Sequence, residues 1–206
     1  MRVVAGLGNP GAEYDGTRHN AGFEVVDRLA ARHGVALRRD RTLNALAGRG
    51  RIGGREVVLL EPHSFMNLSG AVVLRALGRA AGRDGTPDPA ALLVVCDDFA
   101  LPLGILRLRG AGSSGGHHGL EDVEAALGSR AYPRLRIGIG PNTRADPKDF
   151  VLGRFRPSER EAAEESFERA ADAVESWLQA GLDRTMARYN GGPDGDAADG
   201  PGRTEP

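Results

Sequence analysis

Several of the polar side chains between residues 9 and 20 are of types that could carry out hydrolytic chemistry. They are Asn9, Tyr14, Arg18, His19 and Asn20. The ordinary pKa of histidine lies near neutrality, so His19 can act as a general base that activates a water molecule. Asparagine amides can hold a carbonyl or an amide nitrogen without adding charge. The same residues also fit simpler roles as a turn residue, a loop anchor and a helix N-cap pair.

Glycines in the same segment spell G-x-G-x-x-G after an apolar run, as in dinucleotide-binding loops: Gly6, Gly8 and Gly11. In those loops the third glycine lies in a helix whose N-terminus faces the pyrophosphate. Here Pro10 precedes that glycine, and Gly16 interrupts any early helix. No acidic residue stands cleanly at the end of a second strand about 20 residues later. We therefore expect no nucleotide cofactor, and we assign the glycines to shaping a turn.

Two later segments add groups that could join this cluster. Asp97 and Asp98 end the apolar run LLVVCDD, where a carboxylate could support the imidazole of a general base. Phe65 and Asn67 lie in the segment HSFMNLSG, which follows another apolar run. The serines of that segment have no evident base and orienting acid, so a serine nucleophile is not expected.

Cysteine usage and charge exclude some classes of protein. Cys96 is the only cysteine, so an intramolecular disulfide and a cysteine-rich zinc site are excluded, and its strand setting indicates an inert buried thiol. We predict no metal site. The net charge of −1 divides unevenly: residues 159–175 carry −5 and residues 191–206 carry −3, which leaves +7 elsewhere. Such a basic remainder is typical of a protein that binds an acidic polymer.

Hydrophobic periodicity predicts alternating strands and helices. Strands are expected in RVVAGL, REVVLLEP, ALLVVCDD, GILRLRG, RLRIGIG and the region from Ala36 to Ile52. Helices are expected from about Asn20 to Gly34, with Phe23, Val26, Leu29 and Ala30 on the buried face, from about Gly70 to Ala81, through LEDVEAALG, and from Pro157 onward. In the last helix, Phe167, Val174, Trp177 and Leu178 are predicted to be core.

This pattern predicts an α/β fold: a single three-layer domain with a mixed central sheet flanked by helices. We expect that domain to span residues 1–190, and residues 191–206 to form a disordered acidic C-terminal tail, because their Gly, Asp, Ala and Pro cannot bury enough apolar area. The chain has no apolar run long enough to span a membrane and no signal-peptide pattern. We therefore expect a cytoplasmic protein.

The sequence resembles the bacterial-type peptidyl-tRNA hydrolases. The resemblance runs over about residues 2–189, in family order and spacing, through the blocks GLGNPGAEYDGTRHNAGF, PHSFMNLSG, DDFALPLG, GGHHGL, RLRIGIG and DFVLGRF. It implies a monomeric α/β enzyme that needs no cofactor and hydrolyses the ester joining a peptide to the 3′ end of tRNA. It also implies that the partner is peptidyl-tRNA and that the role is to recycle tRNA from peptidyl-tRNA released or stalled during translation.

The resemblance also implies roles for individual residues. His19 falls on the catalytic histidine, Asp97 on the carboxylate that supports it, and Asn9 on a position that distinguishes N-blocked from free aminoacyl groups. Three further residues fall on substrate-contacting positions, namely Tyr14, Phe65 and Asn67.

Three positions depart from the family pattern. His118 replaces the asparagine usual in G-G-H-N-G, which contacts substrate and helps to hold the catalytic water. Cys96 replaces a histidine, and Ala100 replaces an aspartate. A second hypothesis is therefore a homologue that binds tRNA or another RNA and hydrolyses weakly or not at all.

Arginines predict where the nucleic acid binds. Arg107 and Arg109 alternate onto one face of ILRLRG, and Arg134 and Arg136 do so in PRLRIG. Two such strands would present guanidinium groups to phosphates independently of base sequence. The alternative for each arginine is an ordinary solvated face.

Overall fold

The computed structural model describes residues 1–82, 85–140 and 146–192. Within these ranges seven strands form one sheet in the order β2-β3-β4-β1-β5-β7-β6. The strands are β1 Arg2–Gly6, β2 Arg38–Asp40, β3 Ala45–Ile52, β4 Arg55–Pro62, β5 Leu92–Asp98, β6 Leu106–Arg109 and β7 Arg134–Gly138. The helices are α1 Ala21–His33, α2 Gly70–Ala81, α3 His118–Leu127, α4 Pro147–Val151, α5 Arg160–Ala180 and α6 Leu182–Tyr189.

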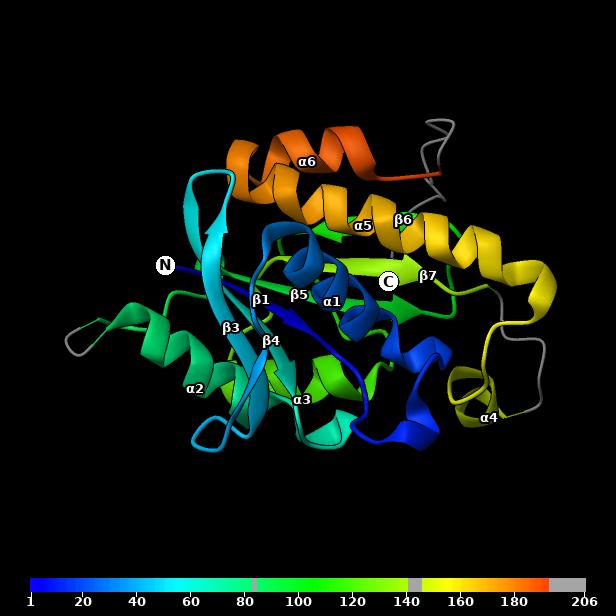
Figure 1. Ribbon diagram of the computed structural model, residues 1–206, viewed down its shortest axis with the longest axis horizontal. Helices are drawn as coiled ribbons and strands as arrows, with labels where there is room; N and C mark the ends of the chain where they lie inside the picture. The colour runs from blue at the N-terminus through cyan, green and yellow to red at the C-terminus, as the bar shows by residue number, and fades with distance from the viewer. Residues whose placement is uncertain (83–84, 141–145, 193–206) are drawn as a thin grey trace, which may run out of the picture.

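The sheet is mixed, as the sequence predicted. Its centre, β4-β1-β5-β7, is parallel, while β2, β3 and β6 pair antiparallel to their neighbours. Hairpin connections explain the antiparallel flank, because β3 and β4 are joined by a turn at Gly53 and Gly54, both of which have positive φ. The parallel strands point their carboxyl ends toward the side of the molecule where α4 lies (Figure 1).

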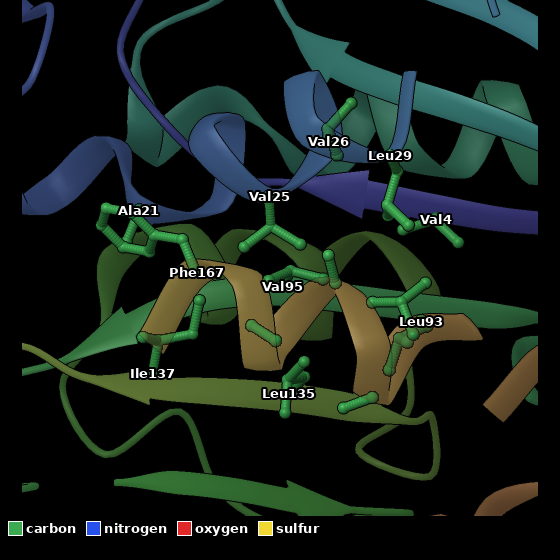
Figure 2. Close-up of a cluster of buried hydrophobic side chains, with 14 of the residues drawn as sticks. Val4, Ala21, Val25, Val26, Leu29, Leu93, Val95, Leu135, Ile137 and Phe167 are labelled. Atoms are coloured by element: carbon green, nitrogen blue, oxygen red, sulfur yellow. The ribbon is translucent and has the colours of Figure 1, made fainter. Parts of the chain in front are cut away.

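Helices cover both faces of the sheet and make three layers (Figure 1). On one face α1 and α5 pack against apolar side chains of the central strands, and Figure 2 shows Val25 and Phe167 meeting Val95 and Ile137 there. On the other face α2 and α3 cover a second cluster that includes Val58. The predicted α/β fold class is confirmed.

Two of the element predictions need correction, and helices α4 and α6 were not predicted. Phe23 is half-buried and Val25 takes its place on the buried face of α1, because the inward stripe of the helix runs through Ala21, Val25 and Leu29. Helix α3 begins at His118, two residues before its predicted start. The predicted core residues Phe167, Val174, Trp177 and Leu178 are all buried.

The predicted boundary between domain and tail falls next to a short pairing. Gly191 exchanges two backbone hydrogen bonds with Leu106 of β6, and Arg169 donates to the carbonyls of Gly191 and Gly192. The rest of the predicted tail, residues 193–206, lies outside the described residues. No helix in the described ranges is both long enough and apolar enough to cross a membrane.

Candidate active site

A cavity of about 540 Å³ opens at the carboxyl ends of the parallel strands. Segments from several places in the sequence line it: the β1–α1 loop, the 3₁₀ turn Met66–Leu68, the end of β5, the loop before α3, strand β7 through Arg136, and α4. Eight of the nine predicted site residues line this cavity: Asn9, Tyr14, His19, Phe65, Asn67, Asp97, His118 and Arg136. The ninth, Arg109, is not among the lining residues.

Close packing of α1 on the sheet brings His19 to Asp97. A Cβ on Gly6 would lie 2.2 Å from the carbonyl oxygen of Gly22, and one on Gly22 would lie 2.4 Å from the carbonyl oxygen of Val95. Only glycine permits this approach. The 3₁₀ turn Arg18–Asn20, directly before α1, therefore sits over the end of β5.

His19 donates a hydrogen bond from Nδ1 to Oδ1 of Asp97 over 2.7 Å. Asp97 is buried, with 1% of its side chain exposed, and His19 is 11% exposed at the cavity wall. Because Nδ1 carries the donated proton, the lone pair of the neutral ring is on Nε2. The Nε2 atom has no hydrogen-bond partner among the described residues. His19 is thus arranged as a base whose free nitrogen is available to a molecule in the cavity.

The two groups shift each other's pKa. Burial of His19 opposes its charged form, but the charge of Asp97 and the hydrogen bond to it outweigh burial and raise the pKa of His19. Burial would raise the pKa of Asp97, but the two neighbouring imidazoles, His19 and His117, hold this pKa far below its usual range. Asp97 therefore remains a carboxylate at neutral pH.

His117 is a site residue that the sequence analysis missed. Its Nε2 lies 3.2 Å from the same Oδ1 of Asp97, and its ring centroid lies 5.1 Å from that of His19. His117 is 6% exposed and lines the cavity. The signal was present in the sequence, because His117 is the first of the two histidines in the GGHHG block.

Asn9 is held by three hydrogen bonds around its backbone and side chain. Its N–H donates to Oδ1 of Asn20, its carbonyl accepts from Nδ2 of Asn20, and its Oδ1 accepts from the backbone N–H of Met66 at 2.9 Å. With Oδ1 engaged, the amide Nδ2 is left without a protein partner within the described ranges. Asn20 stands at the N-cap position of α1 but makes no side-chain cap bond, because its amide is used to hold Asn9.

Three other predicted contacts form the wall and rim of the cavity. Phe65 is 57% exposed and Asn67 is exposed, on the turn that Met66 anchors through Asn9. Tyr14 is half-buried on the opposite segment. An exposed aromatic ring beside amide groups offers an apolar surface together with polar contacts, which suits a peptide.

His118 and Cys96, two of the departures from the family pattern, differ in setting. The side chain of His118 is 75% exposed at the rim, and its Nδ1 lies 3.0 Å from a carboxylate oxygen of Glu121. Cys96 is fully buried, and burial raises the pKa of its thiol to about 12. The prediction of an inert thiol agrees with this environment.

The predicted arginine patch is only partly correct. Arg134 is 1% exposed, with its guanidinium 2.9 Å from Glu124 of α3 and stacked on Tyr132, so it is a structural residue. Arg136 is held 2.9 Å from Asp98 and lies at the cavity. On β6, Arg107 is half-buried and Arg109 is exposed. The alternation was predicted correctly, but α3 covers the part of the face that holds Arg134.

Proton sharing accounts for the cluster of His19, Asp97 and His117. Their neighbouring polar atoms are 2.7 and 3.2 Å apart, which are hydrogen-bond lengths, and Nδ1 of His117 caps α3 through the N–H of Leu120. We assign no metal to these residues.

Comparison with known proteins decides the family. The profile of a family described as peptidyl-tRNA hydrolase matches residues 3–197. The chain belongs to the peptidyl-tRNA hydrolase family. It is 45% identical to the peptidyl-tRNA hydrolase of Carboxydothermus hydrogenoformans, over 93% of this chain and all of that protein. It is 47% identical to that of Chloroflexus aurantiacus, over 92% and 99% of the two chains.

A solved structure agrees with this membership. The crystal structure of peptidyl-tRNA hydrolase from Acinetobacter baumannii superposes with a TM-score of 0.85 at 34% identity, covering 92% of this chain and 94% of the other. The sheet and helices described above are therefore the fold of the peptidyl-tRNA hydrolase family.

Proposed function

We propose that the chain hydrolyses the ester that joins a peptide to the 3′ end of its tRNA, with His19 as general base. The observation that carries the proposal is the buried pair of His19 and Asp97, joined over 2.7 Å, with Nε2 of His19 at a cavity wall and without a hydrogen-bond partner in the described part of the chain. An ester is already activated toward attack, so a positioned water and a base are sufficient. Membership in the peptidyl-tRNA hydrolase family supports this substrate.

The proposed reaction has two steps. Nε2 of His19 takes a proton from water while the water oxygen bonds to the ester carbonyl carbon, which gives a tetrahedral oxyanion. The oxyanion then collapses, the bond from carbon to the ribose oxygen breaks, and the imidazolium returns its proton to that oxygen. Asp97 stabilises the imidazolium between the two steps.

Amide groups of the site are suited to hold the substrate. Nδ2 of Asn9 can donate to a peptide carbonyl, and it has no charge with which to attract a free ammonium. This fits a preference for N-blocked aminoacyl groups. Asn67 can donate to the substrate carbonyl or to the developing oxyanion, and Phe65 and Tyr14 provide apolar contacts beside it.

The nucleic acid is proposed to approach along the edge strand β6. Arg109 is exposed there, and Arg136 lies at the cavity beside Asp98. His118 at the rim is proposed to contact the substrate from the first turn of α3. Contacts to phosphate positions fit an enzyme that accepts many tRNAs, because phosphates carry no sequence information directly.

Two further parts of the proposal are a monomeric state and a cytoplasmic location. The monomeric state is what the resemblance to the bacterial-type peptidyl-tRNA hydrolases implies. Peptidyl-tRNA arises at ribosomes, so the substrate itself favours the cytoplasm. Light scattering of the purified protein tests the first part.

Cleavage of N-acetylaminoacyl-tRNA and of the unblocked aminoacyl-tRNA tests the reaction. We expect cleavage of the blocked substrate only, and a loss of about 10²- to 10⁴-fold in His19→Ala. His33→Ala is the matched control, because His33 pairs with Glu175 on the surface of α1, away from the cavity. Binding of both tRNAs without cleavage of either would instead support the RNA-binding hypothesis.

A further inference from the structure

Asp97 offers one oxygen to two histidines. Oδ1 lies 2.7 Å from Nδ1 of His19 and 3.2 Å from Nε2 of His117, and all three residues are buried. The two rings are tilted by 49° to each other. A carboxylate oxygen that accepts two N–H bonds has its negative charge stabilised twice, and each donor competes with the other for it.

The position of the proton on His117 follows from its other contact. Nδ1 of His117 accepts the backbone N–H of Leu120 at 3.3 Å and so caps the first turn of α3. An accepting nitrogen carries no proton, so the proton of the neutral ring is on Nε2 and is donated to Asp97. A proton on Nδ1 would face the N–H groups at the positive end of α3. His117 is therefore a neutral donor, with neither nitrogen free to act as a base.

We propose that His117 is a positioning residue that limits the hold of Asp97 on the imidazolium of His19 and so sets the pH at which His19 becomes a base. The inference rests on the proposed role of His19. A neutral donor on Oδ1 disperses the carboxylate charge, so less of it acts on His19. Without that donor, the charged form of His19 would persist to higher pH, and less base would be present at neutrality.

Other charged groups face the same cavity from each neighbouring element, and most are paired. Asp98 on β5 lies 2.9 Å from Arg136 on β7, and His118 lies 3.0 Å from Glu121 on α3. Lys148 of α4 also lines the cavity. None of these groups bonds to Oδ1 of Asp97 in the described part of the chain, so His117 is the group placed to compete with His19.

Two substitutions separate the two bonds of His117. In His117→Asn the side-chain oxygen can replace Nδ1 and keep the cap on Leu120, but the side chain is too short to reach Asp97. In His117→Gln the amide nitrogen can replace Nε2 and donate to Asp97, while the cap is lost. The bond to Asp97 is therefore lost only in His117→Asn, and the cap on α3 is lost only in His117→Gln.

The measurement is an NMR titration of the imidazole nitrogens of His19, together with kcat/KM against pH for N-acetylaminoacyl-tRNA. In His117→Asn we expect the pKa of His19 to rise by about half a unit to one unit, and the acid limb of kcat/KM to move by the same amount. Above that limb the rate should return close to the wild-type value. In His117→Gln both curves should stay near wild type, while thermal stability falls.

Equal shifts in the two variants, or no shift in His117→Asn, would overturn the proposal and leave His117 as a helix cap only. Failure of the proposed function looks different. If the wild-type protein does not cleave the substrate at any pH, the NMR titration still reports the coupling of the three side chains. If cleavage depends on His19 but the pKa of His19 does not change in His117→Asn, only the proposed role of His117 is ruled out.

Discussion

The buried carboxylate of Asp97 links the two imidazoles of the site. Asp97 accepts hydrogen bonds from two imidazoles, and its low pKa keeps it ionised where both rings need it. The pKa of His19 is raised, so His19 gains its base form only at a pH above the ordinary value of about 6.5. Activity should therefore rise with pH through a limb that lies above that value.

Asp97→Asn tests this coupling. Removing the negative charge takes away what stabilises the imidazolium, so the pKa of His19 falls and the acid limb of kcat/KM moves to lower pH. The maximal rate should fall by about 10²- to 10⁴-fold, because asparagine does not stabilise the cation that forms during proton transfer. The measurement is kcat/KM from about pH 5 to about pH 9. His118→Asn is the control, and its acid limb of kcat/KM should keep the wild-type midpoint. If the acid limb disappears in His118→Asn, the titrating group is His118 and not His19.

Part of this site could be predicted from residue types and motifs. His19 and Asp97 were predicted to act together, and the structure joins them over 2.7 Å. Residue types alone could not decide between Asp97 and Asp98, because either carboxylate could have faced the histidine, and it was the resemblance that selected Asp97. Their side chains point to opposite faces of β5, one toward His19 and the other toward Arg136. His117 was missed because its bond to Asp97 joins two loops far apart in the sequence.

At the scale of elements, the glycines of the first loop have a structural task. Gly6 and Gly22 let the start of α1 lie directly on the sheet, which places the turn before α1 over Asp97. Helix and strand positions were predictable, since periodicity marks them locally. The order of strands was not, because pairing joins β1 to β5 across about 90 residues and depends on the packing of whole layers. The burial of Arg134 under α3 could not be predicted either, because it also depends on how the layers pack.

Glu61, next to last in β4, gives a prediction about the packing of α1 on the sheet. It is 5% exposed, and burial together with the neighbouring carboxyl groups of Asp27 and Glu24 raises its pKa to about 8. In the unfolded chain Glu ionises near pH 4.3. Between about pH 4.3 and about pH 8 the folded state therefore holds more protons, so stability falls as pH rises through this window.

Glu61→Gln should remove this loss of folding stability at higher pH. Near pH 4 the variant and the wild type should have similar free energies of unfolding, because protonated Glu and Gln are close in shape. Near pH 8 the variant should be more stable by about 2 kcal/mol, as measured by urea unfolding. Glu56→Gln, exposed on the same strand, is the control. A variant that is less stable than wild type at both pH values would show that the carboxyl group of Glu61 makes a favourable contact.

At the scale of the whole molecule, acidic and basic groups are separated and partly cancelled. The acidic helix α5 faces α1, where Arg28 and Arg32 pair with its Glu164, Glu168 and Asp172. These ion pairs neutralise the most acidic described segment within the domain, so its charge acts less on a nucleic acid outside. Exposed arginines elsewhere, including Arg109 on the edge strand β6, are the groups that we propose contact phosphates.

Arg109→Ala tests this route for the substrate. One phosphate contact fewer should weaken binding of tRNA at low salt and reduce the slope of log K against log salt concentration by about 1. The loss should be the same for two tRNAs of different sequence, since phosphates are read without regard to base. Arg51→Ala is the matched control: Arg51 is also an exposed strand arginine, but β3 lies near the opposite edge of the sheet. Fluorescence anisotropy over a series of salt concentrations gives both slopes. Equal slopes for Arg109→Ala and wild type would exclude the β6 edge as a phosphate contact, and a smaller slope in Arg51→Ala would place the tRNA on the other side of the molecule.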